Sequence, residues 1–379
     1  MRIDRRVLLV SAAAALLSVV VVNSSAAPAL RHRSDHAVFV MTNDANANEI
    51  VAFERDENGA LHESRSYTTG GRGSGGRIDP LLSQGSLTLS RDRRWLFAAN
   101  AGSGTVSVFR VRGAQLVLTD EVPTQGAEPN AVAQHGDLVY VLNTAGSSSV
   151  VGFHMAQGKL RRIENSLRFL TGNETGSASI AFSPDGRFLV VAERASNSLD
   201  VFSVLANGEL SELRVNPSAA AGAFAAAFAP SGTLIVSETG PGGPDSSTVS
   251  SYALQADRTL LPITTGMPTF GTANCWNVVT PDGRFVYVSN AGSNSISGFA
   301  IATDGSLTPL VGTIVGTNPS GSTNLDMTLS GDGAFLYTLN AGSGTIGVFA
   351  IDQQSGGLTN LGTVGALPAV AGLNGIAAN

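Results

Sequence analysis

The stretch TPDGRFVYVSNAGSNSISGFAIATDGSLTPL, from Thr280 to Leu310, decides the fold of this chain. It consists of short apolar runs rich in Val, Phe and Ile, separated by the turn sequences Pro-Asp-Gly, Asn-Ala-Gly-Ser and Asp-Gly. Such runs are too short and too regularly interrupted for helices, whereas Asp-Gly and Asn-Gly favour tight hairpin turns. The stretch therefore predicts antiparallel β-strands.

The same unit recurs along the chain. SPDGRFLVVAERASNSLDVFSVLANGELSEL begins at Ser183, and SGDGAFLYTLNAGSGTIGVFAIDQQSGGLTNL begins at Ser330. The residues that end the second apolar run of each copy are Asn43, Asn100, Asn143, Glu193, Glu238, Asn290 and Asn340. These markers are 43 to 57 residues apart, which is the repeat length of propeller blades. Seven units of four strands predict an all-β, seven-bladed β-propeller.

The two ends of the chain predict how the ring closes. The first unit starts at His36 with a second-strand sequence, AVFVMTN, and has no first strand before it. The last residues, LNGIAAN from Leu373, match a first strand such as PNAVAQ from Pro129. We expect the C-terminal strand to pair into blade 1, which leaves no open sheet edge at the seam.

The N-terminus predicts export. Arg2, Arg5 and Arg6 precede an apolar run from Val7 to Val22 and then small residues, as in a signal peptide. The run has 16 residues, fewer than a membrane-spanning helix needs. We expect a signal peptide at 1–26, a linker at 27–35 and the propeller at 36–379, with the mature protein periplasmic or secreted.

Composition limits the partners. Charged residues make up 14% of the chain and the formal net charge is -6, without a basic cluster outside the leader. This pattern argues against nucleic acid as a partner. The single cysteine, Cys275, permits no intrachain disulfide. We expect a monomer with no membrane span that binds a small molecule.

The repeat resembles the seven-bladed lactonase family, which includes the 6-phosphogluconolactonases and the carboxymuconate cyclases. YVSNAGSNSIS from Tyr287 also resembles the YVTN-type repeats of surface-layer propellers. The resemblance implies lactone chemistry at the mouth of the central channel. In the family an Arg and a His open the first strand of some blades, but here Ala178 and Ser179 occupy the matching positions, so this signature is absent.

The repeat also predicts which side chains ring the channel, because the first strand of a propeller blade is the innermost. Reading three residues back from the end of each first strand gives Ser86, Asn130, Ser179, Ala225, Trp276, Asp326 and Asn374. Five of these seven residues are polar. We expect Trp276, Asn130, Ser179, Asn374 and Ser86, together with Glu238 from a neighbouring turn, to bind substrate.

Three residues are the predicted catalytic groups. Asp326 is the only carboxylate of the ring, and burial would raise its pKa into the range of a general base. Glu193 and Arg194 depart from the Asn-Ala-Gly turn of other blades, and a functional site often breaks a repeat. We expect all three to share one pocket with Trp276. The alternative roles are a rim ion pair for Glu193 and Arg194, and a structural carboxylate for Asp326.

Other classes of site find little support in the sequence. None of the five histidines opens a first strand, and without a neighbouring His the Cys275 thiol lacks a base. There is no zinc spacing, P-loop or EF-hand loop, so we expect no metal and no cofactor. The segment GGRGSGGRIDPLL from Gly70 is either a lid whose Arg72 and Arg77 meet an anionic substrate, or a solvated connection.

Two functions remain open. The first is an enzyme that opens or closes the lactone of a small anionic sugar or aromatic acid, as a lactonase or a muconate cycloisomerase-like enzyme. The second is a non-catalytic exported propeller that binds a ligand or a protein partner. The polar ring favours the first, and the missing Arg and His favour the second.

Overall fold

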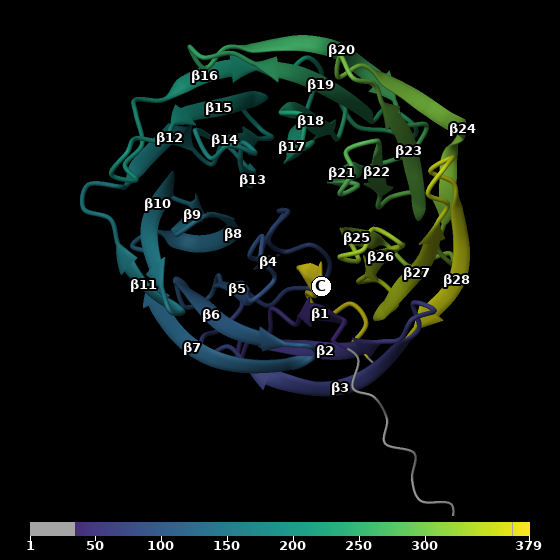
Figure 1. Ribbon diagram of the computed structural model, residues 1–379, viewed down its shortest axis with the longest axis horizontal. Helices are drawn as coiled ribbons and strands as arrows, with labels where there is room; N and C mark the ends of the chain where they lie inside the picture. The colour runs from purple at the N-terminus through teal and green to yellow at the C-terminus, as the bar shows by residue number, and fades with distance from the viewer. Residues whose placement is uncertain (1–34, 366) are drawn as a thin grey trace, which may run out of the picture. The chain divides into compact units, whose positions relative to one another are not determined.

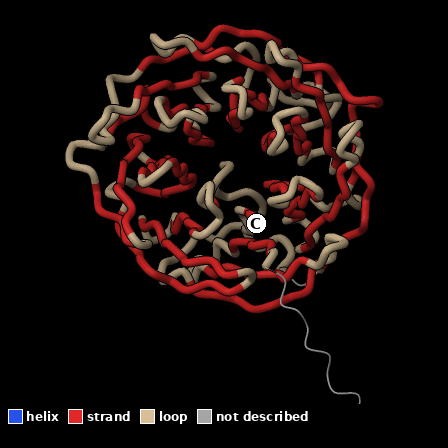
Figure 2. Tube along the Cα trace, in the orientation of Figure 1, coloured by secondary structure: helices blue, strands red, loops and turns tan. Residues whose placement is uncertain are grey.

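The structure, a computed structural model, describes residues 35–365 and 367–379. These residues form 29 β-strands and no helix (Figure 2). The strands make seven antiparallel sheets arranged in a ring around a central axis, which we call the channel (Figure 1). The seven-bladed β-propeller predicted from the repeat is confirmed. The predicted signal peptide, residues 1–26, and residues 27–34 of the predicted linker lie outside the described residues.

Each blade begins at the channel and ends at the circumference. In this order, blade 1 contains β29 (Ile376–Ala378), β1 (Ala37–Met41), β2 (Glu49–Arg55) and β3 (Leu61–Thr68). Blade 2 contains β4 (Leu87–Leu89), β5 (Trp95–Asn100), β6 (Thr105–Arg112) and β7 (Gln115–Pro123). Blade 3 contains β8 (Ala127–His135), β9 (Leu138–Ala145), β10 (Ser147–Ala156), β11 (Lys159–Arg162) and β12 (Arg168–Asn173).

The remaining blades are more alike. Blade 4 contains β13 (Ser177–Phe182), β14 (Phe188–Glu193), β15 (Ser198–Ser203) and β16 (Arg214–Pro217). Blade 5 contains β17 (Ala223–Phe228), β18 (Thr233–Glu238), β19 (Thr248–Leu254) and β20 (Leu260–Pro268). Blade 6 contains β21 (Asn274–Val279), β22 (Phe285–Asn290), β23 (Ser295–Ile301) and β24 (Leu307–Thr317). Blade 7 contains β25 (Asn324–Leu329), β26 (Phe335–Asn340), β27 (Thr345–Ile351) and β28 (Leu358–Val364).

The C-terminal strand closes the ring as predicted. β29 pairs antiparallel with β1, with Val38 opposite Ala378 and Val40 opposite Ile376. The backbone N–H of Ala37 also donates to Oδ1 of Asn379 at 2.6 Å. Blade 1 is therefore built from both ends of the described chain, and its inner edge is covered.

Blade 3 departs from the predicted four strands. Its outer edge is split into β11 and β12, and both pair with β10. The break falls at Ile163–Leu167, where Ser166 Oγ donates to the carbonyl of Ile163 and holds a local turn. Four strands per unit is thus wrong for this blade and right for the other six.

Apolar side chains from facing sheets form the core between blades. The face of β14 and β15 that carries Leu189, Val191 and Phe202 packs against Leu142 and Leu170 of blade 3. In every blade the start of the innermost strand lies beside the end of the second strand, as Ser177 lies opposite Glu193. We call this side the upper face, and the side with the Pro-Asp-Gly turns the lower face.

Candidate active site

The centre of the channel is occupied by residues 77–85, which connect blade 1 to blade 2 and which we call the central connector. Trp276 Nε1 of blade 6 donates to the carbonyl of Ser83 at 2.8 Å. The N–H of Gln84 donates to the carbonyl of Ala178 in blade 4 at 2.8 Å. Ser83 Oγ donates to the carbonyl of Asn130 in blade 3 at 2.7 Å. The central connector therefore bridges blades on different sides of the ring.

The central connector carries Asp79. This residue has a left-handed backbone, with φ of 47°, and its Oδ1 accepts a hydrogen bond from Asn374 Nδ2 at 3.0 Å. Burial raises the pKa of Asp79 well above its usual value, and the charge of Asp326 adds to this, while the hydrogen bond from Asn374 and the charge of Arg194 oppose it. Asp79 is thus a carboxyl group near two charged residues, with some of its surface still accessible.

Asp326 lies deeper in the channel wall. Its carboxylate accepts the N–H of Met327 at 2.9 Å and the N–H of Ile376 at 3.3 Å, and the residue is 3% exposed. Burial raises the pKa of Asp326 to about 7, although the two amide donors pull it down. It lines a cavity of 250 Å³ together with Gln84 and Thr88.

Arg194 lies on the upper face, in the turn between β14 and β15. It lines a pocket of 510 Å³ with Cys275 and with the glycine-rich turn Gly240–Gly243 of blade 5. Arg194 is exposed and makes no ion pair with any residue that the structure describes. It is the one charged residue among those that line this pocket, so the pocket favours an anionic guest.

Cys275 connects this pocket to the carboxyl group of the central connector. Burial raises the pKa of the Cys275 thiol, the charge of Asp79 raises it further, and the charge of Arg194 lowers it. Asp79 and Arg194 are therefore both within electrostatic range of the Cys275 thiol. The raised pKa disfavours the thiolate form of Cys275, which is the nucleophilic form of a cysteine.

Comparison with known proteins identifies the family. The family model for the lactonase, a seven-bladed β-propeller, matches residues 29–174, 167–278 and 277–371. This chain belongs to the lactonase family. A search of curated proteins found no match for this lactonase-family propeller.

Solved structures show the same fold at low identity. A 6-phosphogluconolactonase candidate from Bacteroides fragilis is 19% identical, with a TM-score of 0.68, over 90% of this chain and 98% of its own. The periplasmic gluconolactonase PpgL of Pseudomonas aeruginosa is also 19% identical, with a TM-score of 0.68, over 89% of this chain and 98% of its own. AztD of Citrobacter koseri, 12% identical with a TM-score of 0.57, covers 91% of this chain and 97% of its own.

The structure places Glu193 away from the channel. It is fully buried in blade 4 of this lactonase-family propeller, where it accepts hydrogen bonds from five hydroxyl groups. The donors are Thr171, Thr175, Ser177, Ser196 and Ser198. In blades 2 and 6 the matching Asn100 and Asn290 donate to hydroxyls at the same spacing. Glu in place of Asn at this position thus accepts hydrogen bonds where the Asn side chain donates them, and the role stays structural.

Glu238 has the same role in blade 5. It is fully buried and accepts hydrogen bonds from Ser218 Oγ at 2.9 Å, from Thr248 Oγ1 at 2.7 Å and from Ser250 Oγ at 2.8 Å. The N–H of Ala220 donates at 3.0 Å and the Tyr252 hydroxyl at 3.4 Å. With no exposed surface and this many donors, Glu238 holds the blade together and is closed to a substrate in this structure.

The polar ring residues connect neighbouring blades. Ser179 Oγ donates to the carbonyl of Phe224 in blade 5 at 2.8 Å, and Asn130 Nδ2 donates to the carbonyl of Ser177 in blade 4 at 2.9 Å. Ser86 Oγ of blade 2 donates to Asn374 Oδ1 of blade 1 at 2.8 Å. The innermost strands belong to separate sheets, so these side chains link strands that do not pair with each other.

The predicted pocket shared by Asp326, Glu193, Arg194 and Trp276 is therefore wrong. Arg194 lines the upper pocket and Asp326 lines a separate cavity. Glu193 and Trp276 are each 0% exposed. Adjacent side chains at the end of a strand point to opposite sides, so Glu193 is buried inside blade 4 while Arg194 is exposed.

Asp79 is the site residue that the sequence argument missed. It lies in the Gly/Arg segment outside the repeat, so no alignment of blades brings it to the channel. The segment is solvated only in part, since Gly71, Gly73 and Leu81 are buried. Arg72 and Arg77 are both exposed, and the carbonyl of Arg77 accepts the N–H of Gly372 at 2.8 Å. The signal that was available is Asp79-Pro80 after a glycine-rich run, which marks a turn.

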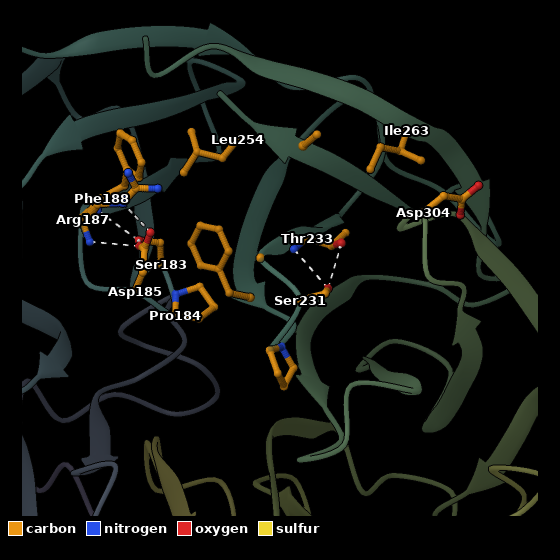
Figure 3. Close-up of a pocket in the computed structure, with 14 residues that line it drawn as sticks. Ser183, Pro184, Asp185, Arg187, Phe188, Ser231, Thr233, Leu254, Ile263 and Asp304 are labelled. Atoms are coloured by element: carbon orange, nitrogen blue, oxygen red, sulfur yellow. Dashed lines mark hydrogen bonds and ion pairs between the residues drawn. The ribbon is translucent and has the colours of Figure 1, made fainter. Parts of the chain in front are cut away.

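A second pocket lies on the lower face between blades 4 and 5 (Figure 3). It has a volume of 390 Å³ and is lined by Phe188, Phe228 and Ile263. Its Arg187 is paired with Asp185 at 2.5 Å, and Figure 3 shows the two side chains facing each other. The described part of the chain holds no cluster of three or more metal-ligating side chains, and no described helix is long and apolar enough to span a membrane.

Proposed function

We propose that this lactonase-family propeller hydrolyses, or in reverse forms, the lactone of a small anionic sugar or aromatic acid at its upper face. The observation that carries the proposal is that the charge of Arg194, which lines the 510 Å³ pocket, lowers the pKa of Asp79, so the carboxyl group and the guanidinium lie within electrostatic range of each other. Lactone hydrolysis needs a base for water and a positive group for the oxyanion, and these two residues supply both.

The proposed reaction starts from the ionised carboxylate of Asp79. It removes a proton from a water molecule, whose oxygen attacks the lactone carbonyl carbon. The guanidinium of Arg194 stabilises the negative charge that develops on the carbonyl oxygen. The ring C–O bond then breaks with its electron pair on the ring oxygen, and the proton passes from Asp79 to that oxygen.

Asp79 is a better base candidate than Asp326 in this structure. Both oxygens of Asp326 accept backbone amides, and its cavity does not include Arg194. Asp79 has part of its surface free and lies near Arg194. We assign Asp326 a positioning role, because its charge helps to raise the pKa of Asp79 toward the range of an effective base.

Export of the protein is part of the proposal. The support is the charge, length and small-residue ending of residues 1–26, together with the fold that this chain shares with the periplasmic gluconolactonase of Pseudomonas aeruginosa. Mass spectrometry of the protein from its native cell fractions tests this proposal. We expect the mature chain to begin near Ala27, whereas bulk protein that retains Met1–Val22 would contradict export.

The competing function is ligand binding without catalysis, which the absence of the family Arg and His at Ala178 and Ser179 favours. The experiment that separates the two functions is a panel of sugar and aromatic lactones, with ring opening followed by proton release. An enzyme turns over at least one anionic lactone. A binding protein shifts its melting temperature with one of these compounds or their acids but hydrolyses none.

A further inference from the structure

Blade 4 contains a second buried carboxyl group, Asp200 on β15. Asp200 is 0% exposed, and neither of its oxygens has a hydrogen-bond partner. The Ser198 hydroxyl lies near enough to lower the pKa of Asp200, but it donates its hydrogen bond to Glu193 Oε2 at 3.0 Å. An ionised carboxylate without donors in a protein interior is strongly unfavourable. The negative charge of Asp200 must therefore be removed or balanced.

The repeat shows what this position requires. Asp200 is the seventh residue after Glu193, and the residues at this position in blades 2 and 6 are Ser107 and Ser297. Ser107 Oγ donates to the carbonyl of Thr69 at 2.7 Å, and Ser297 Oγ donates to the carbonyl of Thr269 at 2.7 Å. In both blades the position supplies an O–H donor toward the preceding blade. An aspartate supplies an O–H donor only when it is protonated.

Charged groups around Asp200 do not favour its ionised form. On β14 the group that faces it is Glu193, whose negative charge is already stabilised by five hydroxyls. On β16 its partner is Val215, and the adjacent Arg214 lies 3.8 Å from Asp257. Toward blade 3 the hydroxyls of Thr171 and Thr175 donate to Glu193. No described cation acts on the pKa of Asp200.

We propose that Asp200 is kept as a neutral carboxylic acid inside blade 4, and that this proton makes the blade a pH-sensitive element beneath the turn that presents Arg194. Burial, and then the charge of Glu193, raise the pKa of Asp200 to about 8. In the unfolded chain the group has its usual pKa of 3.8. Between these values the folded state binds a proton that the unfolded state has lost, so stability falls as the pH rises.

The test compares wild type with Asp200→Asn, which keeps the shape without a titrating group. We expect the ratio of their unfolding equilibrium constants, wild type over variant, to rise about tenfold per pH unit between about pH 5 and pH 7.5. Urea unfolding at several pH values measures it. Asp304→Asn is the control, because the N–H and hydroxyl of Ser306 lower the pKa of exposed Asp304 and its effect has the opposite sign.

A second variant and a spectroscopic measurement cover the case in which Asp200→Asn does not fold. Asp200→Ser restores the residue of blades 2 and 6, and we expect it to fold and to lose the same pH dependence. Difference infrared spectra should show the carbonyl band of a protonated acid at pH 7 in wild type and not in Asp200→Ser. A pH-independent ratio, or calcium-dependent stabilisation that disappears in Asp200→Ser, would overturn the proposal, since the carboxylate would then be ionised.

Discussion

Trp276 Nε1 donates a hydrogen bond at 2.8 Å to the carbonyl of Ser83, which lies 193 residues away in the chain. Trp276 is fully buried and also packs edge-on against Phe224, with ring centroids 5.2 Å apart. It thus fixes the central connector to blades 5 and 6. A residue that the sequence predicted to bind substrate instead positions the segment that carries Asp79.

Trp276→Phe should loosen this segment. The variant keeps an aromatic ring but leaves the Ser83 carbonyl without its donor, which costs about 1–3 kcal/mol of the free energy of unfolding. Urea denaturation measures the loss. Trp95→Phe, at a half-buried tryptophan of blade 2, is the matched control and should cost less. Equal losses in the two variants would mean that the hydrogen bond to Ser83 contributes little.

Removal of the C-terminal strand should open the ring. Deleting Leu373–Asn379 removes β29 and exposes the inner edge of β1, while Asp326 loses the N–H of Ile376. We expect a truncated protein that aggregates or melts without a cooperative transition. Light scattering and calorimetry measure these outcomes, and an unchanged melting curve would show that closure is not needed for stability.

Most of the fold could be predicted because the same turn sequences recur in several blades. Pro-Asp-Gly and Asn-Ala-Gly-Ser fix where strands end, and the missing first strand before His36 fixes the closure by Leu373–Asn379. Blade 3 was harder, since the break between β11 and β12 depends on a turn held by Ser166, which has no counterpart in the repeat.

The site was less predictable for two physical reasons. First, Glu193 and Glu238 look like departures from the repeat, yet they preserve its network with acceptor and donor exchanged. The hydroxyl at Ser198, five residues after Glu193 as Thr105 is after Asn100, was a signal in the sequence for this role. Second, the central connector belongs to no blade, so its place in the channel follows from tertiary contacts alone.

Glu238→Gln tests the structural role of these carboxylates. Gln replaces one acceptor oxygen by an N–H₂ donor, which then faces hydroxyl or amide donors such as Ser218 Oγ and the N–H of Ala220. We expect a loss of about 2 kcal/mol or more in the free energy of unfolding. Glu209→Gln, at a partly exposed glutamate of blade 4, is the control. A catalytic role would instead leave stability unchanged and abolish turnover.

Asp326 should make the protein less stable as the pH rises. Its folded-state pKa of about 7 lies above the usual 3.8, so the folded protein holds a proton that the unfolded chain has released. The contribution of Asp326 to stability should fall between about pH 4 and pH 7, by at most roughly 4 kcal/mol. In urea unfolding, the ratio of the unfolding constants of wild type and Asp326→Asn isolates this contribution from that of Asp200 and should rise with pH over this range. A ratio that does not change with pH would show that Asp326 does not titrate there.

Asp79→Asn and Arg194→Ala test the proposed catalytic pair on a lactone that the wild type hydrolyses. Loss of the base in Asp79→Asn should lower kcat by about a hundredfold or more and remove the rise of kcat with pH, because only ionised Asp79 accepts the proton.

Arg194→Ala should lower kcat/KM, and more for an anionic lactone than for a neutral one, since the guanidinium holds both the anionic group and the oxyanion. Arg284→Ala, at a half-exposed arginine that pairs with Asp282 on the lower face, is the control and should keep full activity. If Asp79→Asn keeps its turnover while Asp326→Asn loses it, the base is Asp326 and the reaction takes place in the cavity of 250 Å³.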